Sequence, residues 1–404
     1  MPDFNHIKEI CSSNSALTAD VVDKFLLYYA AQENKTDKEF EKRLKRFNHV
    51  LSKFPTEFVG LIKAQYIAHR VFRQEGLINR YLKHASLKNL NAAQREYLEM
   101  TVSNPWRFSF CKIIANPSPD FYEMSDIYRE TTYLLYSPSV SKTLAEHPVS
   151  VWFNLIGFNG TCWQTFGPVS FYQSFDADDI FFFATELNDQ ISSDEELLDD
   201  LDNNPVPYMM LSVGSTYPHI RHGDFETIQV SGVTDTYIRD FHTLKQDFTV
   251  FYSTGVYKLV HNEWSKPPHF AEAFYDEDKY ILTLQALSEF GYKKVASILK
   301  VYDLSIPNEP DIRIHPSMLT SIRQLLKKSM DFNKYGKLFE QTPSLKENDE
   351  LGKLNKVLTL ALPFINAGKE PDIDAIAKKA GVPVELAQDL IRHSMERIKE
   401  LIKR

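Results

Sequence analysis

The 404-residue chain has few of the features that mark several protein classes. Its three cysteines, Cys11, Cys111 and Cys162, are odd in number and far apart, so we expect reduced thiols in a cytoplasmic protein rather than a disulfide framework. No apolar run approaches the roughly 18 residues of a membrane span. Residues 1–14 lack the apolar core of a signal peptide. We therefore expect no membrane partner.

Sequence signatures of common enzymes are also missing. The chain contains no P-loop, no G-x-G-x-x-G, no G-x-S-x-G, no H-E-x-x-H and no kinase motif. It has only 14 glycines, which disfavours a glycine-rich loop that would hold a nucleotide. These absences lower the expectation of catalysis without pointing to another function.

Charge is present in large amounts and is distributed unevenly. The net charge is −8, yet residues 33–100 hold 14 basic and 8 acidic side chains, whereas residues 118–205 hold 2 basic and 16 acidic ones. Such segregation predicts either contact between the two surfaces or separate charged partners. Two independently solvated faces are the alternative.

The first hundred residues have the 3.6-residue apolar spacing of helices. Thr36 and Glu39 form a predicted capping box that opens a helix over residues 36–54, which Pro55 ends. The face opposite its apolar stripe carries four basic residues: Lys42, Arg43, Lys45 and Arg46. These four are our candidates for binding nucleic acid or an acidic partner, against the alternative of an ordinary solvated face.

After residue 104, short aromatic and β-branched runs predict strands. We expect them at residues 107–114, 121–128, 131–136, 149–158, 161–172, 180–184, 209–213, 227–233 and 248–260. Asn159-Gly160 is a hairpin signal, and strands so short and closely spaced favour an antiparallel sheet or a small barrel. An acidic insertion at residues 186–206 contains a predicted short helix, capped by Ser193 and Glu196. That helix is either solvated or docked on a basic partner or on helix 36–54.

From about residue 270 the pattern becomes helical again, with helices expected at 280–290, 293–301, 316–330, 351–365, 372–380 and 383–402. The predicted class is α+β. We divide the chain into a helical bundle (residues 1–103), a β-rich region (104–269), a helical region (270–344) and a C-terminal segment (345–404).

Residues 372–391 resemble a helix-turn-helix. Ala377 is small enough for two helices to cross closely, and Gly381 supplies a turn with positive φ. Gln388 and Arg392 on the second helix are candidates for contact with nucleic acid or a protein partner. Glu385 and Asp389 lie beside them and would repel phosphates, which favours a structural or protein-docking hairpin.

A second resemblance covers residues 92–185. Pro105-Trp106-Arg107-Phe108-Ser109-Phe110-Cys111-Lys112-Ile113, Asp126-Ile127-Tyr128, Tyr133-Leu134-Leu135 and Gly167-Pro168 occur in an order similar to that of an uncharacterised bacterial β-rich module. The module is found in some proteins that carry the SEC-C zinc motif. The Cys/His cluster of that motif is absent from this chain, so the resemblance implies an architecture and no metal function.

His219, His222 and Asp224 are candidate ligands for a divalent metal cofactor, with loop histidines in ordinary hydrogen bonds as the alternative. The function we predict is a non-enzymatic binding or regulatory protein that acts through protein contacts, with nucleic acid as a further partner class. The alternative is a metal-dependent enzyme of hydrolase type centred on His219, His222 and Asp224.

Overall fold

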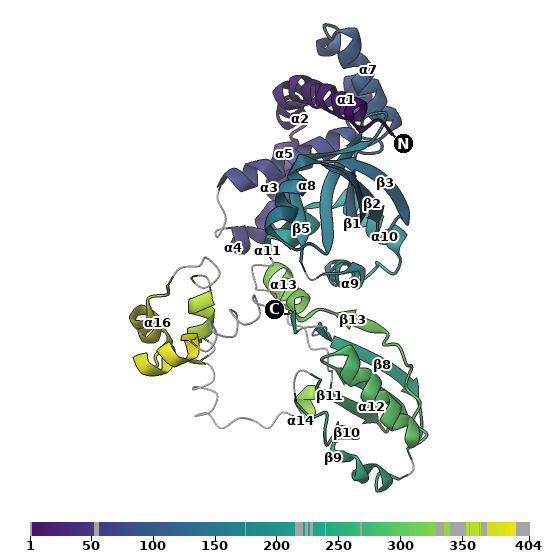
Figure 1. Cartoon of the computed structure of the whole chain (residues 1–404), viewed down its shortest axis with the longest axis vertical. Coiled ribbons are helices and arrows are strands. Elements are labelled where there is room, and N and C mark those ends of the chain that lie inside the picture. Colours follow the sequence, from purple (N-terminus) through teal and green to yellow (C-terminus); the bar gives the residue numbers. More distant parts are fainter. Residues whose placement is uncertain are drawn as a thin grey trace. The chain divides into compact units, whose positions relative to one another are not determined.

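A computed structural model describes most of the chain (Figure 1). The described residues are 2–51, 56–173, 175–214, 221–222, 225–226, 229–238, 240–266, 269–328, 335–339, 353–354, 356–362, 364 and 370–392. The chain forms two compact units, of which the first holds residues 1–250 and 259–332 and the second holds residues 251–258 and 333–404. Helices and sheets occur together, as the predicted α+β class requires.

The first unit begins with a group of helices. Helix α1 (Phe4–Leu17) runs without a break into the π-helical segment η1 (Thr18–Leu26) and then into α2 (Leu27–Glu33). The following helical elements are α3 (Thr36–Leu44), η2 (Lys45–Phe47), α4 (Asn48–Leu51), α5 (Thr56–Phe72), α6 (Ile78–Tyr81), η3 (Ala85–Leu87) and α7 (Ala92–Ser103). The predicted helix over residues 36–54 is therefore divided by a 3₁₀ turn.

The predicted capping box at Thr36 is wrong. Lys35, in the left-handed conformation, precedes α3, and no side chain caps the helix. Thr36 is buried, and its hydroxyl has no partner among the described residues, because the side chain points into the core rather than toward the free backbone N–H groups. A capping box does form at α7, where Asn91 and Gln94 bond each other's backbone N–H groups.

Five strands close into a small barrel, as predicted from their spacing. They are β1 (Arg107–Ser118), β2 (Phe121–Asp126), β3 (Thr131–Tyr136), β4 (Val151–Phe158) and β5 (Trp163–Tyr172), arranged in the order β1-β2-β3-β5-β4. The barrel is not wholly antiparallel, because β3 and β5 pair in parallel, with α8 (Pro138–Glu146) and β4 between them in the chain. At the β4–β5 turn, Gly160 has φ +91° and the Asn159 side-chain oxygen accepts from the N–H groups of Thr161 and Cys162.

Two predicted strands are helices instead. Residues 180–184 belong to α9 (Ala177–Leu187), and residues 209–213 belong to α11 (Val206–Gly214). Asp176 and Asp179 form a capping box that starts α9, which buries one face through Ile180, Phe183 and Ala184. Short apolar runs do not distinguish a buried strand from a buried helix, so the packing of the whole unit decided these two segments. The acidic helix α10 (Asp194–Asn203) lies between them in the chain.

A second sheet follows, with strand order β13-β8-β12-β11-β10-β9. Its strands are β8 (Gln229–Asp235), β9 (Phe248–Ser253), β10 (Val256–His261), β11 (Ala271–Asp276), β12 (Ile281–Ala286) and β13 (Ile312–Ile314). The remaining elements here are β6 (Arg221–His222), β7 (Phe225–Glu226), η4 (Thr243–Gln246), α12 (Glu289–Val301) and α13 (Pro316–Leu326). The predicted helix over residues 280–290 is wrong, because residues 281–286 alternate between half-buried and buried side chains, the period of a strand.

The second unit contains a small group of C-terminal helices. They comprise α14 (Gly336–Phe339), the helical residues 353–354, 356–362 and 364, α16 (Ile373–Ala380) and the helical residues 384–392. Asp372 caps α16, and Gly381 ends it with φ +73°. The shared core consists of Val357, Ala361, Ile376, Ala377, Ala380, Ala387 and Ile391. The positive-φ glycine and the buried Ala377 are both as predicted.

Candidate functional site

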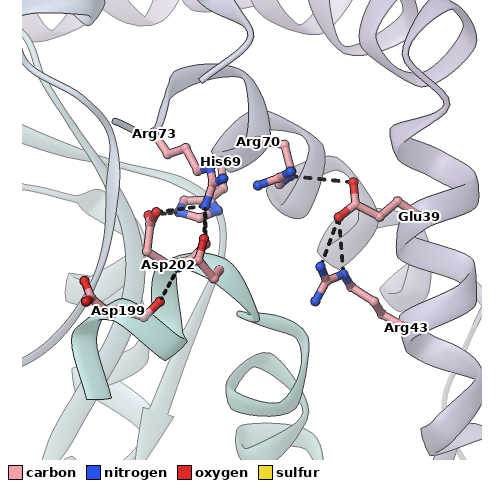
Figure 2. A network of polar contacts seen from close by, with 8 residues as sticks. Glu39, Arg43, His69, Arg70, Arg73, Asp199 and Asp202 are labelled. Carbon is pink, nitrogen blue, oxygen red and sulfur yellow. Dashed lines mark hydrogen bonds and ion pairs between the residues drawn. The ribbon is translucent and has the colours of Figure 1, made fainter. Parts of the chain in front are cut away.

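The basic and acidic regions of the chain meet in a polar network (Figure 2). Asp202, near the end of α10, accepts a hydrogen bond from His69 Nε2 at 2.9 Å and forms an ion pair with Arg73 at 2.9 Å. Arg43 of α3 donates to the side chain of Asn204 at 3.0 Å. Asp194, Glu195, Glu196 and Asp199 are exposed, as in a solvated helix. The ion pair of Asp202 is with Arg73, beyond α5, and not with the predicted helix over residues 36–54, of which Arg43 reaches only Asn204.

The environment of this network sets its protonation states. Burial lowers the pKa of His69, although Asp202 acts in the opposite direction, so the imidazole is neutral and donates through Nε2. Burial alone would raise the pKa of Asp202, but the hydrogen bond from His69 and the charge of Arg73 bring it below its usual value. The neutral His69 and the cationic Arg73 thus both bind the Asp202 carboxylate, and this contact links α10 to α5.

The four basic candidates on residues 36–54 separate into two kinds. Arg43 is engaged within the unit, by Glu39 at 3.1 Å and by Asn204. Glu39 also pairs with Arg70 of α5 (Figure 2). Lys42, Lys45 and Arg46 are exposed. Three of the four therefore remain accessible to a partner, and one is a structural residue.

The C-terminal candidates lie on the helical residues 384–392. Gln388 and Arg392 are both exposed, and Arg392 forms an ion pair with Asp389 at 2.9 Å. Val384 and Leu386, at the start of the same helix, are each 44% exposed. The exposed surface of this helix therefore includes both apolar side chains and a pair of oppositely charged side chains.

The structure does not describe the side chains of the predicted metal ligands. His219 and Asp224 lie outside the described residues, and His222 is described only through its backbone in the short strand β6. No group of three or more His, Cys, Asp or Glu side chains suited to a metal occurs in the described part of the chain. That finding does not bear on His219 and Asp224, so the metal site stays a prediction.

Sequence reasoning did not anticipate a cleft in the first unit. Its volume is about 420 Å³, within the range of small-molecule pockets. Helices α1, η1, α5 and α7 form one wall through Asn14, Ser15, Thr18, Asp23, Leu61, Ala64 and Tyr97. The barrel forms the other wall through Trp106, Gly157, Phe158, Gln164, Thr165, Phe166 and Gly167. The cleft therefore lies where the N-terminal helices cover β4 and β5.

Gln164 holds one end of the cleft together. Its side-chain oxygen accepts from Asn14 at 3.0 Å and from Asn159 at 2.8 Å, and its nitrogen donates to the Cys11 carbonyl and the Ser15 hydroxyl, both at 3.1 Å. One amide thus makes four hydrogen bonds, of which three attach α1 to the barrel and the one from Asn159 lies within the barrel. The Asn14 side-chain oxygen and the Ser15 O–H, both of residues that line the cleft, keep bonding capacity.

Behind Gln164, two thiols face each other. The Cys11 and Cys162 sulfurs are 3.3 Å apart, and the Asn159 amide donates to Cys11 at 3.3 Å. Hydrogen bonds from Cys162 and Asn159 lower the pKa of Cys11, and the same contact raises the pKa of Cys162. All three cysteines are free thiols and buried. The thiols are free, as predicted, and two of them lie side by side although they are 151 residues apart in the chain.

The π-helical segment of the helical wall contributes the carboxylate of Asp23 and the hydroxyl of Thr18 to the cleft. Thr18 donates to the Asn14 backbone carbonyl, so the Tyr97 hydroxyl, 2.9 Å away, donates to Thr18. Burial raises the pKa of Asp23, and its negative charge adds to the burial that raises the pKa of Tyr97. π-helical turns are rare and occur often at functional sites. Here the π-helical segment contributes Thr18 and Asp23 to the cleft.

Trp106 forms the floor on the barrel side. It is 5% exposed, its backbone N–H donates to the Phe72 carbonyl, and its ring lies 5.1 Å from that of Phe166. A Cβ at Gly157 would lie 2.4 Å from the indole nitrogen, so only glycine lets the ring lie this close to β4. The indole N–H has no hydrogen-bond partner in the described part of the chain. It is not among the fully buried groups that lack a partner, so it is accessible at the edge of the cleft, where a ligand acceptor can bond to it.

The cleft residues gave no common signal in the sequence. Asn14, Asp23, Tyr97, Trp106 and Gln164 come from five segments, and none belongs to a motif with a known spacing. Of the cleft residues, Gly157 was the one whose role could most nearly be predicted, because a glycine inside a strand often marks the close approach of another group.

No family model matches the chain, and neither a search of curated proteins nor one of solved structures found a match. The resemblances at residues 92–185 and 372–391 therefore receive no support from these comparisons. No helix in the described residues is long and apolar enough to cross a bilayer.

Proposed function

We propose that the protein is a non-enzymatic binding protein that holds a small molecule in the cleft between its N-terminal helices and its barrel. The observation that carries the proposal is the indole N–H of Trp106, a donor without a partner among the described residues at the wall of a cleft of about 420 Å³. This N–H is not among the fully buried groups that lack a partner, so it is accessible at the cleft wall and can donate to a ligand acceptor there.

The composition of the lining supports binding of an amphipathic ligand. Phe158, Phe166 and Leu61 supply apolar surface, while Ser15 and Asn14 supply hydroxyl and amide groups at one end. Pockets for small molecules combine mostly apolar walls with a few placed polar groups in this way. Gln164 and the glycine contact at Gly157 fix the walls before a ligand arrives, which reduces the entropy lost on binding.

A screen of small metabolites by thermal shift, followed by calorimetry, tests this function. The variant Ala64→Trp places a large ring in the cleft and should abolish binding of any hit. Glu57→Trp, an exposed position of the same helix outside the lining, is the matched control and should bind as wild type does. A hit that binds Ala64→Trp unchanged would place the site elsewhere and refute the proposal.

As a second candidate function, we propose that the C-terminal helices contact a protein partner. Val384 and Leu386 expose apolar surface, whereas Arg392 is paired with Asp389 and is therefore less available to a phosphate. This arrangement favours a protein over the DNA that a helix-turn-helix would bind, because groove-reading helices depend on unpaired basic groups.

Affinity capture with the full chain compares wild type with Leu386→Asp. Ala375→Asp, an exposed position on α16, is the control with the same added charge. Loss of one partner with Leu386→Asp alone supports docking by this helix. Binding to duplex DNA that weakens steeply as salt increases, and that Gln388→Ala or Lys378→Ala weakens further, would instead establish the nucleic-acid role.

A further inference from the structure

We infer that the ligand of the cleft is a small organic cation, an ammonium group attached to an apolar or aromatic portion, held by the Asp23 carboxylate and the surrounding aromatic rings. The inference rests on the proposed binding function and adds the chemical class of the ligand. It follows from the charge of the lining, from its rings, and from the open donor at Trp106.

The charge of the cleft is negative and uncompensated. Asp23 has no ion pair and no hydrogen bond within the described residues, and the described lining contains no Lys, Arg or His. Asp20, three residues earlier on the same π-helical segment, is paired with Lys24 at 2.8 Å. The segment thus neutralises one carboxylate and leaves the other facing the cleft.

Such a carboxylate has a preference for cations. Removal of water from around a carboxylate disfavours its charged form unless a positive group replaces the water. Asp23 is exposed by surface area, yet it lies in the cleft wall, where partial burial raises its pKa and no cation of the described chain pairs with it. A ligand ammonium would supply the missing charge, whereas an anionic ligand would be repelled.

The aromatic content of the walls favours the same class of ligand. Tyr97, Trp106, Phe158 and Phe166 all line the cleft. Trp106 and Phe166 are inclined by 46°, so their faces do not cover each other completely. Ring faces attract ammonium groups within about 6 Å, and a tryptophan face does so most strongly. Carboxylate and ring faces together make up the usual surroundings of a bound organic ammonium.

The remaining polar groups suggest where the rest of the ligand lies. The Trp106 indole N–H and the Ser15 hydroxyl can each donate to an acceptor. A ligand that carries an oxygen acceptor besides its ammonium would satisfy both kinds of group. Its volume must fit the cleft of about 420 Å³, which limits it to a molecule of metabolite size.

The experiment uses two probes with one skeleton, phenethylammonium and the neutral 2-phenylethanol. Both are titrated into the full-length protein, and binding is followed by ligand-observed NMR and calorimetry. We expect wild type to bind the cation at least about tenfold more tightly than the alcohol. Asp23→Asn, which keeps the shape of the side chain, should remove that preference, and added salt should weaken it.

Asp20→Asn is the matched control, since it removes the same charge from the same helical segment outside the lining. It should retain the preference. Equal binding of both probes by wild type would overturn the cation inference and leave the proposed binding function standing. Equal loss in Asp20→Asn and Asp23→Asn would reduce the effect to general surface charge and also overturn the inference. Binding of neither probe, with no hit from the metabolite screen, would refute both the inference and the proposed function.

Discussion

Asp202 and Asp23 are both carboxylates on helices of the first unit, and they differ in what lies opposite them. Asp202 contacts His69 and Arg73, each at 2.9 Å, and joins α10 to α5 (Figure 2). Asp23 lines the cleft and has no partner within the described part of the chain. The first carboxylate has its pKa lowered and the second has its pKa raised.

The difference separates charges that hold the fold together from charges that are open to a ligand. The acidic run at residues 194–202 is the densest group of carboxylates in the sequence, yet Asp202 at its end is bonded to His69 and Arg73. Asp23 is inconspicuous in the sequence and stays unpaired. Local charge density therefore did not indicate which carboxylate lacks a partner, whereas the charged groups around each carboxylate do.

The largest expected effect comes from removal of Asp202. Asp202→Ala removes the acceptor of the buried His69 Nε2–H and the ion-pair partner of Arg73, which keeps the residue-202 carbonyl and Asn203 as acceptors. We expect the free energy of unfolding to fall by about 2–4 kcal/mol. Asp199→Ala, at an exposed position of the same helix, is the control and should change it by less than about 0.5 kcal/mol. Urea unfolding measures both. Equal, small effects would show that the network is not structural.

A buried carboxyl without a counter-charge should give the opposite pH dependence to Asp202. Burial raises the pKa of Asp179 to about 7, although the backbone N–H groups of Asp176 and His315 donate to it. The folded state then holds this proton more tightly than the unfolded state between about pH 4 and 7, so stability falls as pH rises through that window.

Asp179→Asn removes this dependence. We expect wild type to lose about 2–3 kcal/mol relative to Asp179→Asn between pH 4 and 7. Asp202, whose pKa is lowered, stabilises the fold above its unfolded pKa and loses that contribution as pH falls through its folded pKa. Unfolding curves of wild type and Asp179→Asn from about pH 4 to 7, and of wild type and Asp202→Asn as pH falls below about 4, check the two signs. A parallel pH response of wild type and Asp179→Asn would contradict the assignment.

Gly157→Ala should alter the cleft and the stability together. The added Cβ would lie 2.4 Å from the Trp106 indole nitrogen, so the ring must move. We expect a loss of about 1–3 kcal/mol, typical of overpacking, and a change in tryptophan fluorescence. Gly60→Ala, whose Cβ would meet nothing within 4 Å, is the control and should not lose stability. An unperturbed Gly157→Ala would mean that Trp106 is not held as described.

Asp23→Asn should have the smallest effect on stability. Asp23 has no partner to lose within the described residues, and its raised pKa means that ionisation slightly disfavours the folded state at neutral pH. We expect stability within about 0.5 kcal/mol of wild type, shifted upward if at all. Thermal unfolding measures it. A large loss would show that Asp23 is a structural residue like Asp202.

The sequence was informative where structure depends on neighbouring residues. The Asn159-Gly160 turn, the five barrel strands and the turn at Gly381 could each be predicted from local chemistry. Residues 180–184 and 281–286 were misassigned, because short apolar runs fit both a strand and a helix. The π-helical segment gave no signal in advance.

The cleft could not be predicted for a different reason. Asn14 and Gln164 are 150 residues apart in the chain, and the Cys11–Cys162 contact spans 151. Such contacts depend on how the N-terminal helices pack on the barrel, which composition and periodicity do not specify. Even Asp23 is distinguished from Asp20 only by the direction in which each faces.

The pKa of Asp23, measured by carboxyl ¹³C NMR with and without phenethylammonium, tests the central claim most directly. Tyr97 of α7 is the titratable group that faces Asp23, and the Asp20–Lys24 pair lies on its own helix. We predict a pKa above the usual aspartate value of about 3.9 in the free protein, which falls when the cation binds. A usual pKa that does not respond to the cation would contradict the claim that Asp23 is an open site for a cationic ligand.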